Sequence, residues 1–212
     1  IITDTSFPDT LNMSSVYNEE LLRDIRINAA NQMQELEMSL AETLKKQALD
    51  NISIKTLVVG GEIEHELRAL CDEFHPDLVI MGTTGKGNTL QIWGKVSTFI
   101  IDHAKVPVIT VPAIRQFRGF DHIMFAADLS DGNERAIRRI RELFAPFRSV
   151  VHVVHFAPKA KPGDAYIRMK ALEIKFKEEH SNLDFTFEII EVEEDNQKAI
   201  DLFVARHQID LI

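Results

Sequence analysis

The sequence has a single cysteine, Cys71, among its 212 residues, so it cannot form an internal disulfide bond. It also has no apolar run long enough to span a membrane, and no signal peptide. The net charge of −9 argues against nucleic acid or an anionic membrane as the main partner, because both attract clustered cations. These absences predict a globular protein of the cytoplasm.

Signatures of catalysis and of metal binding are missing as well. No Ser/His/Asp or Cys/His pattern has a supporting motif, and no paired carboxylates stand out. His152 and His155 are three positions apart on a predicted strand, so they should face opposite sides of the sheet. That spacing does not suit a shared metal ion. We therefore predict no metal site and no catalytic residue.

The most informative segment runs from Asp77 to Pro112. Residues 78–81 (LVIM) form an apolar run without polar alternation, which is typical of a parallel strand covered on both faces. A glycine-rich loop and a helical segment follow, and residues 106–112 (VPVITVP) read as a second strand. Glycines between a strand's carboxyl end and a helix let backbone N–H groups approach an anion, so this segment predicts a phosphate loop.

Strands and helices alternate along the rest of the chain. The apolar periodicity predicts helices at 19–47, 133–144, 165–180 and 196–207, and a helix around Cys71 that ends at Phe74. It predicts further strands at 52–59, 122–127, 150–156 and 185–192, and a turn-rich connection over 1–18. Such alternation indicates an α/β fold, built from parallel βαβ units with helices on both faces of the sheet.

The sequence also contains a hidden repeat. Residues 52–59 align with 185–192, and 77–79 align with 210–212, at a constant offset of 133 positions. We interpret this as two copies of one domain, at 1–114 and 119–212. The first copy lacks the strand, turn and helix of 120–145, and the second ends before a glycine loop. We therefore expect these 212 residues to be an internal portion of a longer chain.

With these pieces in place, the sequence resembles the universal stress protein family, as a tandem of two such domains. The resemblance lies in DLVIMGTTGKG and AKVPVITVP of the first copy, and in HIMFAADLS of the second. It implies a five-stranded parallel sheet with helices on both faces. Members that bind ATP share a signature of Gly, two residues, Gly, nine residues, Gly and then Ser or Thr, whose residues hold the phosphates and ribose.

The first copy matches this signature in part. Gly82 and Gly85 fit, but only eight residues separate Gly85 from Gly94, and Lys95 stands at the hydroxyl position. One residue fewer turns the helix start by about 100°. Either these residues bind nucleotide or the glycines only close a tight turn, and both interpretations stay open. The resemblance implies as nucleotide-binding candidates Gly82, Thr83, Gly85, Gly87, Gly94, Lys95 and Ser97.

In the second copy, Asp128 matches the acidic residue with which the family reaches the adenine side. Asp128 could instead lie in the approach to a helix, with Ser130 or Asp131 accepting the first N–H groups of that helix. The sequence leaves both roles open.

The resemblance implies a stress-response module that binds an adenine nucleotide, ATP or AMP, with Mg²⁺ accompanying ATP. It also implies that stress-protein domains pair with each other, within one chain or as a homodimer. Two alternatives remain: a stress-response interaction protein that binds no nucleotide, and a slow ATPase. The eight-residue spacing and Lys95 favour the interaction protein.

Overall fold

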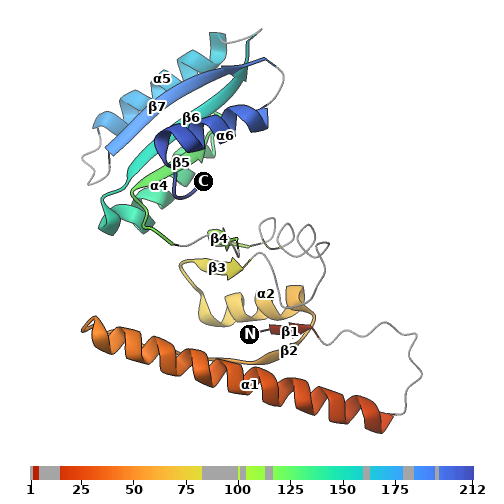
Figure 1. Cartoon of the computed structure of the whole chain (residues 1–212). Helices are drawn as coiled ribbons and strands as arrows, with labels where there is room; N and C mark the ends of the chain where they lie inside the picture. The colour runs from red at the N-terminus through yellow and green to blue at the C-terminus, as the bar shows by residue number, and fades with distance from the viewer. Residues whose placement is uncertain are drawn as a thin grey trace. The chain divides into compact units, whose positions relative to one another are not determined.

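The computed structural model describes residues 2–4, 15–82, 100, 104–112, 117–159, 163–178, 184–193 and 196–212. The chain divides into two compact units, Ile1–Arg115 and Gln116–Ile212, which we describe one at a time (Figure 1). Within the described ranges, no helix combines the length and the apolar character that crossing a membrane requires.

The second unit is a parallel α/β sheet. Its elements are β5 (His122–Ala126), α4 (Asn133–Phe144), a 3-10 turn (Ala145–Phe147), β6 (Val150–Pro158), α5 (Gly163–Glu178), β7 (Asp184–Val192) and α6 (Asn196–His207). The strands pair in the order β5-β6-β7, and all pairs are parallel. Leu211 adds a parallel bridge to Ile123 on the other edge of β5, so β5 is an interior strand.

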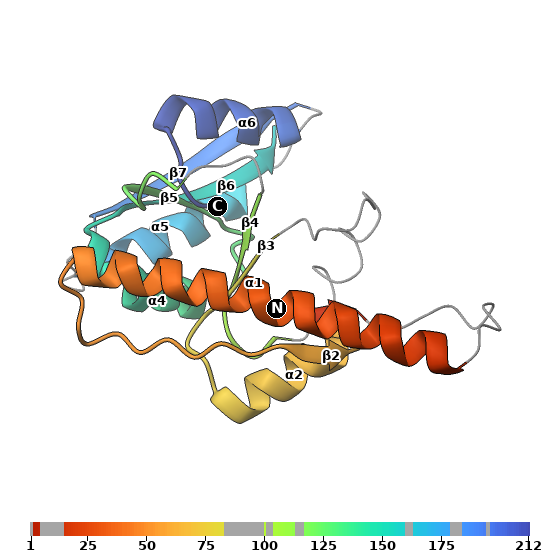
Figure 2. The ribbon, with the colours of Figure 1, turned by 60° about the horizontal axis from the view of Figure 1, so that its bottom comes forward.

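Both faces of this sheet are covered because adjacent strand residues point to opposite sides. On one face, Met124 and Val154 pack against Phe203 and Ile209, which places α6 there. Ile123, next to Met124 in the strand, points to the opposite face. Helices α4 and α5 cover that face (Figures 1 and 2). The buried side chains of these two helices include Ile137, Met169, Leu172 and Phe176. The predicted α/β class, with a parallel sheet and helices on both faces, is confirmed.

The first unit has less sheet. Its elements are β1 (Ile2–Asp4), α1 (Ser15–Lys46), β2 (Val59–Gly61), α2 (Ile63–Phe74), β3 (Val79–Gly82) and β4 (Val108–Val111). Strand β1 pairs with β2, and β3 pairs with β4, again in parallel, but the two pairs are separate sheets. Ile100 is helical, and its carbonyl accepts the Ala104 N–H at 2.8 Å.

Side-chain burial differs sharply between the units. In the described part of the first unit, only Ala29 and Ile100 are buried apolar residues, and all the others belong to the second unit. By contrast, the side chains of Ile52, Phe74 and Ile80 are 48%, 43% and 64% exposed. The first unit therefore leaves large apolar side chains in contact with water.

Three expectations for the first unit need correction. The strand predicted at 52–59 is wrong: residues 52–58 form no strand, and β2 begins only at Val59. A strand extends only as far as a neighbour pairs with its backbone, and β1 offers three residues where β6 offers nine to β7. The expectation that residues 78–81 are covered on both faces is wrong too, since Ile80 is exposed. Finally, the connection predicted over 1–18 contains β1 and the first residues of α1.

Candidate functional site

The candidate site of the second unit lies at the carboxyl end of β5. From β5 the chain crosses through α4 to β6 on one side, and it later returns at Leu211 on the other side. The strand order therefore reverses at β5. In open α/β sheets, ligands bind outside the carboxyl ends of the strands at such a reversal. The loop between β5 and α4, residues 127–132, occupies that place.

Asp128 organises this loop. Its Oδ1 atom accepts the backbone N–H of Ser130 at 2.9 Å and also a hydrogen bond from Nδ2 of Asn133. Asn133 is 3% exposed, and its Nδ2 also donates to the carbonyl of Ser130 at 2.9 Å. Leu129, between these residues, has a φ of 60°, in the left-handed region that a tight turn requires. The loop is thus closed by short-range hydrogen bonds to one carboxylate.

These contacts keep the carboxylate charged. The Asn133 side-chain hydrogen bond, followed by the Ser130 backbone hydrogen bond, lowers the pKa of Asp128 to about 2. Asp128 is exposed, so an ionised acceptor faces solvent at the carboxyl end of β5. Among the described residues, Oδ1 of Asn133 is buried without a hydrogen-bond partner.

Replacing Asn133 by alanine should move the pKa of Asp128 from about 2 toward its ordinary value of 3.8, because the strongest stabiliser of the charged form is lost. Carboxyl NMR titration measures this directly. Ser130→Ala is the matched control: it keeps the Ser130 N–H and the Asn133 amide, so its shift should be smaller. An Asn133→Ala protein in which Asp128 still titrates near 2 would contradict this assignment.

The start of α4 bears on the second role considered for Asp128. The residue that caps α4 is Gly132, which has no side chain to accept an N–H. The backbone carbonyl of Ser130 accepts the Asn133 N–H at 3.1 Å instead. Asp128 therefore closes the turn that leads into the helix, and the start of α4 has no side-chain cap. The contact of Asp128 with an adenine base stays a prediction.

Two further side chains hold the loop from outside. Nη1 of Arg168, on α5, donates to the carbonyl of Leu129 at 3.3 Å. Nδ1 of His155, on β6, lies 2.7 Å from the carbonyl of Ala127. The guanidinium of Arg168 therefore contacts the loop that carries the Asp128 carboxylate. A positively charged and a negatively charged side chain are thus both present at the carboxyl end of β5.

In the first unit the structure places one of the predicted site residues. Gly82 is the last residue of β3 and lies opposite Val111 of β4, at the carboxyl ends of both strands. This is the position at which the predicted phosphate loop begins. The other candidates fall outside the described residues, and their roles stay predictions: Thr83, Gly85, Gly87, Gly94, Lys95 and Ser97.

A cluster of three histidines lies near the opposite end of the second unit's strands. Nε2 of His152 is 3.2 Å from Nδ1 of His122, and the rings of His152 and His207 have centroids 5.0 Å apart. Nδ1 of His152 is 2.9 Å from Oγ1 of Thr186 on β7. Burial, and then the nearby His207 and His122, lower the pKa of His152 to about 4. His152 is therefore neutral at physiological pH.

Sequence reasoning did not find this cluster, because its members are far apart in the chain. Aligning the predicted parallel strands would have placed His122 beside the start of β6, near His152. His207 comes in only through the packing of α6 on the sheet. In the described part of the chain, no three His, Cys, Asp or Glu side chains are arranged to hold a metal ion.

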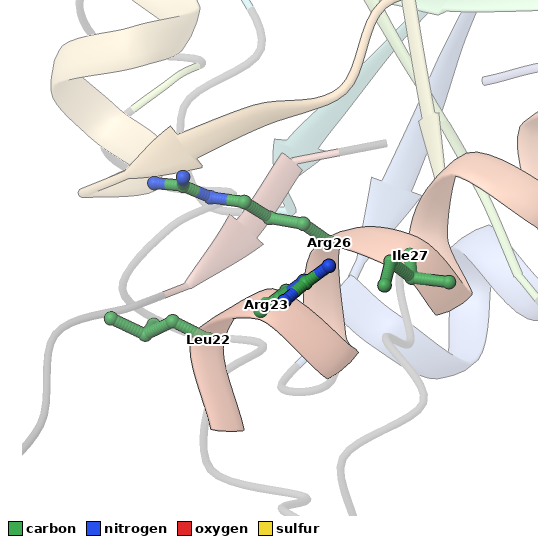
Figure 3. Close-up of a pocket in the computed structure, with 4 residues that line it drawn as sticks. All are labelled: Leu22, Arg23, Arg26 and Ile27. Carbon is green, nitrogen blue, oxygen red and sulfur yellow. The ribbon is translucent and has the colours of Figure 1, made fainter. Parts of the chain in front are cut away.

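The surface of α1 has a hollow lined by Leu22, Arg23, Arg26 and Ile27 (Figure 3). All four residues come from one stretch of a single helix. None of them is a predicted site residue, and we assign no ligand to this hollow.

A parallel sheet with crossover helices on both faces defines a Rossmann-like α/β protein. The universal stress protein family matches residues 8–112. The first unit of the chain therefore belongs to the universal stress protein family.

Comparison of the fold agrees with this assignment. The crystal structure of a universal stress protein from Archaeoglobus fulgidus superposes with a TM-score of 0.61, over 98% of this chain and 70% of that chain. The two sequences are 15% identical, so the likeness concerns the fold. No curated protein sequence matches the chain.

Proposed function

We propose that this universal stress protein is a stress-response regulatory module that binds an adenine nucleotide, ATP or AMP, with Mg²⁺ accompanying ATP. The observation that carries the proposal is Asp128, an exposed and ionised carboxylate where the strand order reverses. An ionised carboxylate only accepts hydrogen bonds, and the amino group of adenine donates them. Gly82, at the carboxyl end of β3, is the point at which the predicted phosphate loop of the first unit begins.

Nucleotide binding would act by mass action. A ligand that binds only the folded protein stabilises it, and it shifts any equilibrium between states that bind it unequally. The module would then report nucleotide levels through a change in conformation or in partner binding, within the paired domains or between two copies of the chain. No reaction step is needed for that role.

Thermal unfolding with millimolar ATP and Mg²⁺ tests the proposal. At a hundred times the Kd, ligand binding adds about 2.7 kcal/mol to the free energy of unfolding. For a unit of this size, that raises Tm by roughly ten degrees or more. Asp128→Asn should reduce the shift from the second unit, and Gly82→Val that from the first. Asp131→Asn, another exposed carboxylate of the same loop, should leave the shift unchanged.

The alternative function is an interaction protein that binds no nucleotide. It is favoured by the exposed apolar side chains of the first unit, such as Phe74 and Ile80. Absence of any thermal shift with ATP or AMP would exclude the nucleotide-binding module and leave this alternative. Release of phosphate above background, lost in Gly82→Val, would instead identify a slow ATPase.

A further inference from the structure

The three-histidine cluster of the second unit connects the sheet to α6. His122 and His152 lie on β5 and β6, which are hydrogen-bonded neighbours, and Thr186, which contacts His152, lies on β7. His207 belongs to α6. Two members of the cluster are therefore on paired strands, and the third is on a helix that packs on the sheet through its side chains.

Helix α6 covers the imidazole of His152. His152 pairs with Met124 across the strands, so both side chains lie on the face that α6 covers. The His152 ring makes an edge contact with Phe203 of α6, at a centroid distance of 5.8 Å, and the His207 ring lies 5.0 Å away. His152 is only 5% exposed. Movement of α6 away from the sheet would therefore bring water to this ring.

The contact that holds α6 on the sheet is also the contact with the titratable ring. Phe203 is buried in the apolar cluster that contains Met124 and Val154. The rings of Phe203 and His207 are stacked, with centroids 4.1 Å apart, and both rings are close to His152. The packing of α6 and the protonation of His152 are therefore coupled.

The surroundings of His152 do not favour a positive charge. Its Nε2 atom is 3.2 Å from Nδ1 of His122, so one of these nitrogens donates and the other accepts. If both rings are protonated, two N–H groups and two like charges face each other. Asp210, which follows α6, accepts the backbone N–H of His122 through Oδ2 at 3.0 Å, so this carboxylate contacts the backbone of β5.

Movement of α6 would remove much of this cost. His122 and His152 stay on paired strands, whereas His207 leaves with the helix and water takes its place beside the His152 ring. Burial is the main cause of the lowered pKa of His152, and the charge of His207 is the next. Because the open form then binds a proton more readily than the closed form, acid favours the open form.

We propose that the histidine cluster is a pH-sensitive switch: below about pH 6, protonation of His152 releases α6 from the sheet while β5, β6 and β7 stay paired. Release uncovers the apolar face formed by Met124 and Val154, with Phe156 and Ile190 beside them. The strands stay paired because their pairing uses backbone groups that do not titrate. The switch does not depend on nucleotide binding, which concerns the other end of β5.

Native-state hydrogen exchange of the full 212-residue chain tests the proposal, at about pH 7.5 and about pH 5 over a urea series. Protection factors, which are corrected for the effect of pH on exchange itself, give the opening constant of each segment. We expect the opening constant of 196–207 to rise at least about tenfold at the lower pH, because return of the His152 pKa from about 4 to its ordinary 6.5 allows up to about 30-fold. The α6 amides should also open at lower free energy, and with a weaker dependence on urea, than the β6 amides, since release of one helix exposes less surface.

Two variants remove the titrating group in different ways. His152→Gln keeps a polar partner for Thr186, and His152→Phe keeps a ring, so either one that folds should limit the rise to about twofold. His65→Gln, on the exposed surface of α2, should behave as the wild type. A rise in the His152 variants equal to that of the wild type overturns the proposal. So does a wild type whose α6 and β6 amides share one opening free energy and one urea dependence, because the unit then opens only as a whole.

Discussion

Ile137→Ala is expected to lower the free energy of unfolding of the second unit by about 3 kcal/mol. Ile137 is 0% exposed and lies on the face of α4 that packs on the sheet. Alanine removes buried methylene and methyl groups and leaves a cavity that neighbouring strands fill only in part. Native-state hydrogen exchange of β6 amides under increasing urea measures the loss in this unit alone.

The matched control is the same substitution in the first unit. Ile80→Ala removes the same atoms from a side chain that is 64% exposed, so we expect a change below about 0.5 kcal/mol. The comparison therefore measures how differently the two units are packed. A loss of about 3 kcal/mol in both proteins would contradict the burial described here.

Acid should destabilise the second unit through His152. Its pKa of about 4 in the folded protein lies below the ordinary 6.5, so folding favours the neutral ring. The resulting stability is complete above pH 6.5 and is lost as the pH falls from 6.5 toward 4. The whole shift corresponds to about 3 kcal/mol, and screening by water at the edge of the sheet reduces this to roughly 2 kcal/mol.

The side chains that face His152 explain why protonation is costly. His122 on β5 and His207 on α6 are both close, so a charge on His152 would be repelled by either ring once protonated. Thr186 on β7 is neutral, and Phe203 on α6 is apolar. None of these four neighbours of the His152 ring is a carboxylate, so none of them compensates a positive charge on it.

A pH series of unfolding free energies, taken from exchange of β6 amides, tests this. His152→Gln should remove most of the loss between pH 6.5 and 4.5. His65→Gln is the control, because His65 lies on the surface of α2 with its side chain 77% exposed. If the wild type and His152→Gln lose the same stability over this range, another group is responsible.

The sequence predicted the second unit almost residue for residue. Helices α4 and α6 begin and end where the periodicity placed them, and the strands differ by a few residues at most. The agreement has a physical reason: the strands of this unit are paired along their length, and both faces of the sheet are covered by helices. Apolar residues such as Ile137 and Phe144 can therefore be buried where the sequence pattern predicts. Asp128 was singled out through the resemblance of HIMFAADLS to the universal stress protein family, and its contact with a nucleotide stays a prediction.

The first unit was predicted less well for a physical reason. Residues 52–58 have the β-branched composition of a strand, yet only Val59–Gly61 find a neighbour in β1. Strand formation is a property of a pair, so it cannot be inferred from one segment alone. The histidine cluster and the role of Asn133 were missed for a similar reason: both depend on contacts between segments that the pattern of single residues does not encode.

The bridge between Ile123 and Leu211 sets an order for folding. It joins residues 88 positions apart, whereas the first pairs of β5 with β6 and of β6 with β7, His122–Val150 and Val150–Asp184, join residues 28 and 34 apart. Closing the longer loop costs about 1 kcal/mol more entropy. We therefore expect β5, β6 and β7 to pair before Leu211 joins Ile123, a bridge that lies near the amino end of β5 and away from the Asp128 loop at its carboxyl end.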